Sequence, residues 1–270
     1  MPKPPVPAIV FVDADAAPGA LPSDRSDRLP GALELLAARR VTIVLCSRRT
    51  RAEFESVRQA LGIFHPFICE RGAAAYVPER YFGSDLENAR RVGGYQAIEF
   101  GEPYEKVVGT LHRIADRVGL GIAGFNDMSV DQVALECGLS LLDARLAKLR
   151  EYVEPFRLES ANPVAERRLV KALESAGLTC TPFGDFHEVG TAADPGGAIA
   201  VLSTLYRVAF GSIVTACAGG DEWSAQIGGR VETRLSPPAG DPPAWLESIA
   251  RDMDDIRVAA LARPAARYAR

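Results

Sequence analysis

The chain lacks any apolar stretch long enough to cross a membrane, and it lacks a dense block of basic residues. No apolar run approaches the roughly 18 residues that a membrane-spanning helix needs. The 31 Lys and Arg residues are outnumbered by 35 Asp and Glu residues, which gives a net charge of −4. Because nucleic acids and anionic membranes attract basic surfaces, we expect neither as a partner.

Cysteine and histidine are scarce, and neither has the spacing of a metal site. The five cysteines include no Cys-x-x-Cys pair, and the three histidines lack ligand spacing. An odd number of scattered cysteines favours reduced, buried thiols over a disulfide framework or a zinc site. The stretch Met1–Pro5 also lacks the apolar core of a secretory signal, so we expect a cytoplasmic protein.

What the chain does have is a globular composition and an alternating pattern of elements. Its 270 residues are 47% hydrophobic and 24% charged, which suits one large domain or a core with an insertion. Buried strands and amphipathic helices are predicted in alternation, at residues 9–13, 31–38, 41–46, 50–61, 196–210 and 213–218. This order predicts an α/β fold with a parallel sheet and right-handed crossovers.

The middle of the chain changes character after residues 81–88 and is predicted to form a separate α/β insert. Ser129 and Ser140 each precede a helical apolar pattern, as an N-cap residue does. The other predicted elements are a strand at 95–100, helices at 104–118 and 163–176, and strands near 178–181 and 186–189.

Asp13 and Asp15 lie one residue apart where the first predicted strand ends. Burying two like charges is costly unless a cation or hydrogen bonds compensate them. Ligands bind at the carboxyl ends of strands in open α/β sheets, and Mg²⁺ accepts one or two carboxylates together with water and phosphate. The pair therefore indicates a catalytic or metal site, with a solvated turn as the alternative.

Two further predicted strands also end in polar residues. Ser47 follows one of them, and Asp221 and Glu222 follow another. In a parallel sheet these ends share one edge, so we expect an acid pair, a hydroxyl and a further acid to meet there. This set suits magnesium-assisted phosphoryl transfer, in which one carboxylate attacks phosphorus and another handles the proton of the leaving group.

Three segments, at residues 44–53, 66–78 and 124–156, carry a family resemblance and run in the family's order. The most specific is Gly-Phe-Asn-Asp-Met-Ser at 124–129. Together they resemble the mannosyl-3-phosphoglycerate phosphatase family of the haloacid dehalogenase (HAD) superfamily. The resemblance implies a Rossmann-like HAD core at residues 1–83 and 191–270, with an inserted α/β cap of the C2B type at residues 84–190.

The resemblance also implies roles for individual residues. Asp13 matches the nucleophile, which would form an aspartyl-phosphate, and Asp15 matches the general acid. Ser47 matches the hydroxyl that binds phosphate. Mg²⁺ would be held by Asp13, Asp15 and Asp221. The residues expected to face the substrate, a small phosphorylated sugar acid, are Arg48, Arg49, Arg150, Glu151 and Tyr152.

The chain departs from the family pattern at three places. The Gly-Thr that usually follows the acid pair is replaced by Ala16-Ala17-Pro18, and the family's third motif, which contains lysine, reads Asp-Pro-Gly-Gly at 194–197. The fourth motif is reduced to Gly-Gly-Asp-Glu-Trp-Ser at 219–224, so either Asp221 reaches the metal position or a glycine lies there. The cations that could replace the lysine are Arg48, Arg49, Arg167, Arg168 and Lys171.

Three functions are consistent with these features. The first is a magnesium-dependent phosphatase. The second is a degenerate relative that binds a phosphorylated ligand or a partner protein with little or no catalysis. The third is a phosphotransferase whose acceptor is not water. The sequence favours the first, because an acid pair retained together with a matching cap is difficult to attribute to the fold alone. No oligomeric state is predicted.

Overall fold

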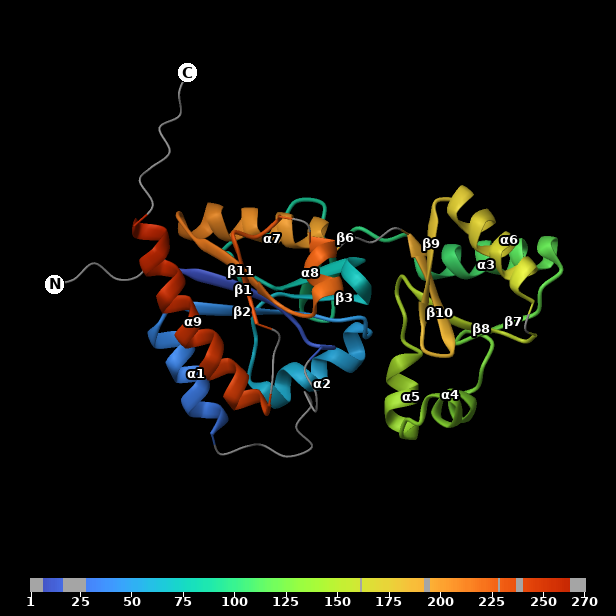
Figure 1. The fold of residues 1–270 in the computed structure, drawn as a ribbon, viewed down its shortest axis with the longest axis horizontal. Coiled ribbons are helices and arrows are strands. Elements are labelled where there is room, and N and C mark those ends of the chain that lie inside the picture. The colour runs from blue at the N-terminus through green and yellow to red at the C-terminus, as the bar shows by residue number, and fades with distance from the viewer. Residues whose placement is uncertain are drawn as a thin grey trace, which may run out of the picture.

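Two β-sheets, each with its own helices, form the two lobes of the molecule (Figure 1). The computed structural model describes residues 7–16, 28–160, 162–191, 195–227, 229–236 and 240–262. Within these residues, no helix is long and apolar enough to cross a membrane. The strands of the large sheet, in spatial order, are β12 (Thr233–Leu235), β11 (Val214–Ala218), β1 (Ala8–Asp13), β2 (Val41–Cys46), β3 (Phe67–Cys69), β4 (Ala74–Pro78), β6 (Tyr95–Glu99) and β5 (Arg90–Val92).

The large sheet is parallel from β12 to β3 and antiparallel from β3 to β5. Its central strand β1 is buried, as an apolar, β-branched segment between two parallel neighbours should be. In its register Asp13 lies beside Cys46, and Val12 lies beside Ala218. Residues just after β1, β2 and β11 therefore emerge at the same edge, which confirms the predicted α/β class with a mostly parallel sheet.

Helices cover both faces of this sheet, and β1 divides its side chains between them with the period of two that a strand imposes. Val10 and Val12 face the side covered by α1 (Leu29–Ala38), α2 (Arg51–Leu61) and α9 (Pro242–Ala262). Ile9 and Phe11 face the side covered by α7 (Pro195–Phe210) and α8 (Asp221–Ile227). The predicted capping box of α2 is present, with Thr50 and Glu53 bonded to each other's backbone N–H groups.

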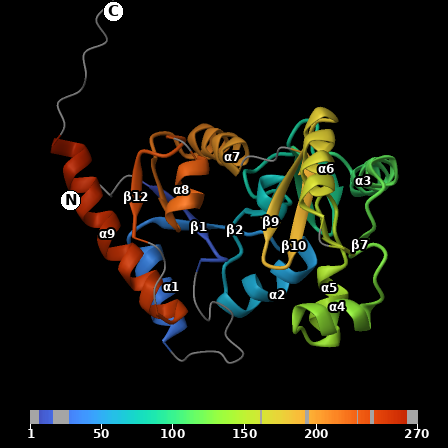
Figure 2. The same ribbon diagram turned by 45° about the vertical axis from the view of Figure 1, so that its right-hand side comes forward.

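The second lobe, residues 104–191, is called the small unit below (Figure 2). Its four strands pair antiparallel, in the order β7 (Ile122–Gly124), β8 (Glu154–Leu158), β10 (Phe186–Thr191) and β9 (Leu178–Phe183). Two helices, α3 (Tyr104–Val118) and α6 (Pro163–Ser175), share an apolar core with this sheet. The short helices α4 (Val130–Cys137) and α5 (Leu141–Ala147) begin after Ser129 and Ser140, which are N-caps as predicted.

The change from one sheet to the other comes later in the chain than the predicted boundary at residue 84. Both β5 and β6 belong to the large sheet, because β6 pairs antiparallel with β4 from Ala74 to Pro78. The polar stretch around residues 81–88 is therefore a connection within the large sheet. A loop's composition marks where an element ends, but it does not show which sheet the next strand joins.

Candidate active site

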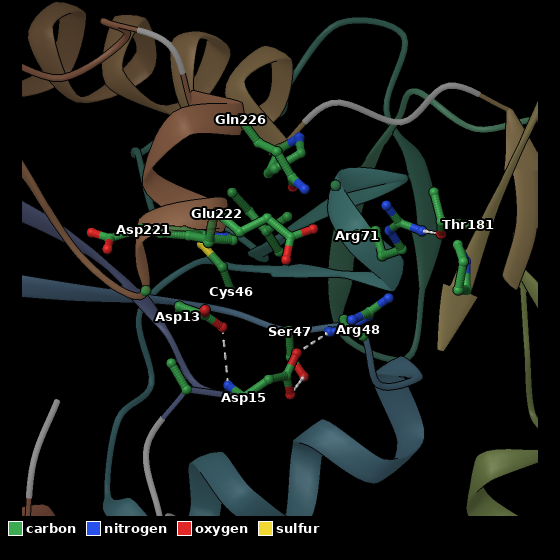
Figure 3. A pocket seen from close by; sticks show the side chains of 17 residues that line it. Asp13, Asp15, Cys46, Ser47, Arg48, Arg71, Thr181, Asp221, Glu222 and Gln226 are labelled. Atoms are coloured by element: carbon green, nitrogen blue, oxygen red, sulfur yellow. Dashed lines mark hydrogen bonds between the residues drawn. The ribbon is translucent and has the colours of Figure 1, made fainter. Parts of the chain in front are cut away.

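The two predicted acids and the predicted hydroxyl meet at the carboxyl end of β1 (Figure 3). The backbone N–H of Asp15 donates to Asp13 Oδ1 at 3.1 Å. Ser47 Oγ donates to Asp15 Oδ1 at 2.8 Å, and the backbone N–H of Arg48 donates to Asp15 Oδ2 at 2.6 Å. The loop after β2 thus fixes the orientation of the Asp15 carboxylate, whereas Asp13 faces the pocket from the end of the central strand.

The environment of Asp13 disfavours its negative charge. Burial, the largest cause, and the nearby charge of Asp15 raise the pKa of Asp13 to about 6 from an ordinary value of 3.8. The N–H groups of Asp15 and Ala16 and the charge of Arg48 oppose this increase. A raised carboxyl pKa in a pocket is characteristic of a functional site, and a bound cation would lower it again.

The acids open into a pocket of about 490 Å³ at the junction of the large sheet and the small unit. Asp13, Asp15 and Ser47 form its floor, while Thr181 and Pro182 of β9 contribute from the small unit. The N-terminal end of α7, at Pro195, and the first turn of α8 complete the wall. Residues of both lobes therefore contact whatever occupies this pocket. Ala17, Pro18 and Asp194 lie outside the described residues.

The residue packed against Asp13 from β11 is a glycine. A Cβ atom at Gly219 would lie 2.8 Å from Asp13 Cβ and 2.4 Å from the Trp223 ring, so no side chain fits there. Asp221 begins α8, and Figure 3 shows its carboxylate turned away from Asp13, while that of Glu222 is turned into the pocket. Successive side chains on a helix diverge by about 100°. The structure therefore does not bring Asp221, the third predicted metal ligand, to the acid pair.

Two arginines line the pocket, and one buried carboxylate of the small unit lies against both. Arg48 donates from Nε and Nη2 to Glu188 Oε2 at 3.1 and 2.8 Å. Arg71 Nη1 lies 3.5 Å from the same oxygen and donates a hydrogen bond to the Thr181 hydroxyl. Burial, the largest cause, lowers the pKa of Arg71, and the charge of Glu188 opposes this shift; the guanidinium nevertheless stays charged at neutral pH.

Arg71 did not emerge from the sequence as a functional residue. It lies in the turn Glu70–Gly72, directly after the short strand β3. A signal was present, because a charged residue that follows a buried strand reaches the same sheet edge as Asp13. The strand has only three residues, too few for a clear periodic pattern.

The other proposed cations lie outside the pocket. Arg49 Nε is 4.0 Å from Asp15 Oδ1, at the edge of the acid pair. Arg167, Arg168 and Lys171 are exposed residues of α6 and do not line the pocket.

Arg150, predicted to face the substrate, is half-buried and does not line the pocket. Its guanidinium donates to the backbone carbonyls of Arg48 at 2.9 Å and Ala147 at 3.0 Å. Burial, the largest cause, lowers the pKa of Arg150, but the charges of Glu70 and other nearby acids together raise it above its ordinary value. Arg150 thus supports the loop that carries Arg48 and does not itself line the pocket.

Glu151 and Tyr152, the other predicted substrate residues, join the small unit to the large sheet. Glu151 accepts from Arg51 at 2.9 Å and from Arg90 at 2.8 Å. The fully buried Glu70 carboxylate accepts the backbone N–H groups of residues 151, 152 and 153 at 2.9, 3.0 and 2.8 Å. Neither Glu151 nor Tyr152 lines the pocket, so the structure places both in the junction between the lobes.

The most specific sequence motif, at residues 124–129, also has a structural explanation. Asp127 Oδ2 accepts the N–H of Gly124 at 2.9 Å, and Glu154 accepts the N–H of Asn126 at 2.9 Å. A Cβ atom at Gly124 would lie 2.1 Å from Glu154 Oε1, so a side chain there would displace the carboxylate that accepts the Asn126 N–H. Burial is the largest cause that raises the pKa of Glu154, to about 7. This turn leads into α4 and lies outside the pocket.

Comparison with known proteins identifies relatives along most of the chain. A glucosyl-3-phosphoglycerate/mannosyl-3-phosphoglycerate phosphatase of Methanococcoides burtonii is 35% identical over 211 residues, which cover 78% of this chain and 77% of that protein. A mannosyl-3-phosphoglycerate phosphatase of Pyrococcus horikoshii is 29% identical over 199 residues, 74% of this chain and 78% of its own. The chain matches none of the protein-family models it was compared with.

Solved structures support the same fold. A phosphatase of the HAD superfamily from Bacteroides thetaiotaomicron superposes with a TM-score of 0.57, covering 94% of this chain and 96% of its own at 13% identity. A haloacid dehalogenase-like hydrolase from the same organism gives a TM-score of 0.55, covering 93% and 99% at 12% identity. At these identities the structures establish the fold, and the curated relatives establish the family. The chain belongs to the mannosyl-3-phosphoglycerate phosphatase family of phosphoric monoester hydrolases, and it has the fold of the HAD-superfamily phosphatases it was compared with.

Proposed function

We propose that this protein is a Mg²⁺-dependent phosphatase that hydrolyses a small phosphorylated sugar acid, similar to mannosyl-3-phosphoglycerate, through an aspartyl-phosphate intermediate. The observation that carries this proposal is the convergence of Asp13, Asp15 and Ser47 at one sheet edge, at the floor of a pocket of about 490 Å³. The relatives' names supply the substrate class. The five free cysteines agree with the expected reducing, cytoplasmic location.

The chain's own residues have distinct tasks in this reaction. The Asp13 carboxylate attacks phosphorus, and the bond between phosphorus and the ester oxygen breaks as Asp15 gives that oxygen its proton. Asp15 then takes a proton from water, which attacks the phosphorus of the aspartyl-phosphate and restores Asp13. The hydroxyl of Ser47, which already orients Asp15 at 2.8 Å, would turn to a phosphoryl oxygen when substrate binds.

The donor set fits Mg²⁺, although with fewer carboxylates than the sequence predicted. Mg²⁺ is usually bound by one or two carboxylates and keeps several waters, and the Asp13 carboxylate and the Asp15 backbone carbonyl could hold it. Burial and the charge of Asp15 raise the pKa of Asp13, and a cation held there would oppose this shift. Among the described residues, no group of three or more acids, histidines or cysteines could hold a metal. When bound, the ion would neutralise charge on the phosphoryl group.

A second candidate function is a degenerate relative that binds a phosphorylated ligand or a partner protein. Two observations favour it. Gly219 lies against Asp13, with Asp221 turned away, and Pro195 lies on the pocket wall at the end of α7, where the sequence provides no lysine. A phosphotransferase that uses an acceptor other than water would share this pocket, and no observation favours it.

A phosphate-release screen separates the two candidates. The protein is incubated with a panel of phosphorylated metabolites, with Mg²⁺ and with EDTA, beside the Asp13→Asn variant as control. Phosphate release by the wild type alone, dependent on Mg²⁺, is the expected result. Tight binding of a phosphorylated compound without any release would instead support the degenerate relative.

A further inference from the structure

Negative charges outnumber positive charges among the residues that line the pocket. Among the described residues, its lining includes four carboxylates and only two cations, Arg48 and Arg71. An anionic substrate enters such a site only where positive charge and N–H donors compensate its desolvation. The question is which of the two arginines is available to a ligand.

Arg48 is already committed to a buried carboxylate and to an aromatic ring. Two of its N–H groups donate to Glu188 Oε2, and its guanidinium lies over the Phe183 ring, 4.4 Å from the ring centre. The Glu188 side chain is only 1% exposed, so withdrawing Arg48 would leave a buried carboxylate without its main partner. Arg48 therefore holds the wall of the pocket together.

Arg71 is in contact with the same carboxylate but is not saturated by it. Its Nη1 stands 3.5 Å from Glu188 Oε2, longer than the ~2.9 Å of a good N–H···O hydrogen bond. Among the described residues its side chain donates only to the Thr181 hydroxyl, and a guanidinium has five N–H groups. Figure 3 shows Arg71 across the pocket from Asp13, directed toward Thr181 on β9.

The backbone that presents Arg71 is unusual and tightly held. Glu70, Arg71 and Gly72 have consecutive φ values of 47°, 60° and 93°, a left-handed run that non-glycine residues rarely adopt. The N–H of Arg71 donates to the Ser47 carbonyl at 3.2 Å, and the Glu70 carboxylate accepts the three N–H groups described above. Strain retained under such constraint points to a function for the side chain it places.

We propose that Arg71, positioned by Thr181, is the residue that reads the carboxylate of the phosphorylated substrate. The planar guanidinium fork matches a planar carboxylate, and its surroundings already accommodate one, that of Glu188. The phosphoryl group would lie at Asp13, and the carboxylate would lie at the boundary with the small unit. This assignment rests on the proposed function for the identity of the substrate, and it replaces Arg150, which donates to the Arg48 carbonyl and does not line the pocket.

The test compares two ligands that differ in the carboxylate: 3-phosphoglycerate and glycerol 3-phosphate. Binding is measured by calorimetry to the Asp13→Asn variant, so that the readout does not depend on turnover. In this background, Arg71→Gln should weaken the binding of 3-phosphoglycerate about ten- to a hundredfold, which is the contribution of a charged hydrogen bond. The same variant should weaken the binding of glycerol 3-phosphate less than about threefold.

Further variants separate recognition from folding. Arg71→Lys should give an intermediate loss, because it keeps the charge but loses the fork. Thr181→Val should weaken the binding of 3-phosphoglycerate but not that of glycerol 3-phosphate. Thr181→Ser, which keeps the hydroxyl, should bind 3-phosphoglycerate as tightly as Thr181 does. Arg167→Gln, an exposed arginine of α6, is the matched control and should change neither ligand.

The outcomes are distinguishable. Equal losses for both ligands, an unchanged affinity for 3-phosphoglycerate, or failure of the Asp13→Asn protein to bind it would overturn the assignment of Arg71. Selective binding through Arg71, without any hydrolysis by the wild type, would uphold the assignment and contradict only the proposed phosphatase activity.

Discussion

The two sides of the pocket floor differ in how completely they are built. On the side of β1 and β2, Asp15 is held by both Ser47 and the Arg48 backbone, and Asp13 faces the pocket. On the side of β11, Gly219 provides no side chain, and the carboxylate of Asp221, the first acid of α8, points away from Asp13. The comparison shows that the acid pair is held in place by its neighbours, whereas the opposite side of the floor directs no carboxylate toward Asp13.

The largest expected effect tests the intact side. Asp13→Asn should lower phosphate release by at least about a thousandfold, as removal of a nucleophile does. The side chains are nearly isosteric, so the melting temperature should not fall. A variant that keeps the wild-type rate would rule out the aspartyl-phosphate. It would also remove the functional difference between the two sides of the pocket floor.

The next effect tests whether the missing positive charge at the start of α7 limits turnover. Pro195→Lys places a cation on the pocket wall and should raise kcat about tenfold or more if the site is merely weakened. Gly197→Lys is the matched control, because Gly197 does not line the pocket and an added Cβ there meets nothing within 4 Å. Equal effects from both lysines would indicate a general charge effect instead of a local one.

A smaller effect distinguishes the two acids of α8. Glu222→Gln should raise the Mg²⁺ concentration for half-maximal activity several-fold, since its carboxylate is turned into the pocket and adds to the local negative potential. Asp221→Asn should change it less than twofold. The opposite order, measured by Mg²⁺ titration of the initial rate, would restore Asp221 as the metal residue.

The last expected effect is on stability instead of activity, and it depends on pH. The pKa of Asp13 is about 6 in the folded protein against 3.8 for an ordinary Asp, so the folded state holds this proton more tightly. Its stabilising contribution is complete below about pH 4 and is lost as pH rises to about 6. The free energy of unfolding of Asp13→Asn relative to wild type should therefore increase by about 1–3 kcal/mol across this range. A difference independent of pH, in urea titrations, would show that the folded site does not perturb Asp13.

Local sequence determined much of the fold and one side of the site. The apolar run before Asp13 is sufficient to predict a buried strand. The N-caps Thr50, Ser129 and Ser140 act within three residues of themselves, at the starts of their helices. Asp13, Asp15 and Ser47 could be placed together because parallel strands share an edge, whatever the rest of the chain does. These predictions depended on short-range chemistry and on one topological rule.

Tertiary structure decided the remainder, because it depends on contacts between distant segments. The strand predicted at 95–100 to open the insert extends the large sheet instead, since β4 offered it an edge. The rotation of α8 decided which of Asp221 and Glu222 faces the pocket. Arg71 acquired its position from a left-handed turn held by Glu70, whose partners lie some eighty positions along the chain. Spacing along a sequence specifies what a strand or a cap can do, whereas the direction of a side chain is fixed only when its neighbours are in place.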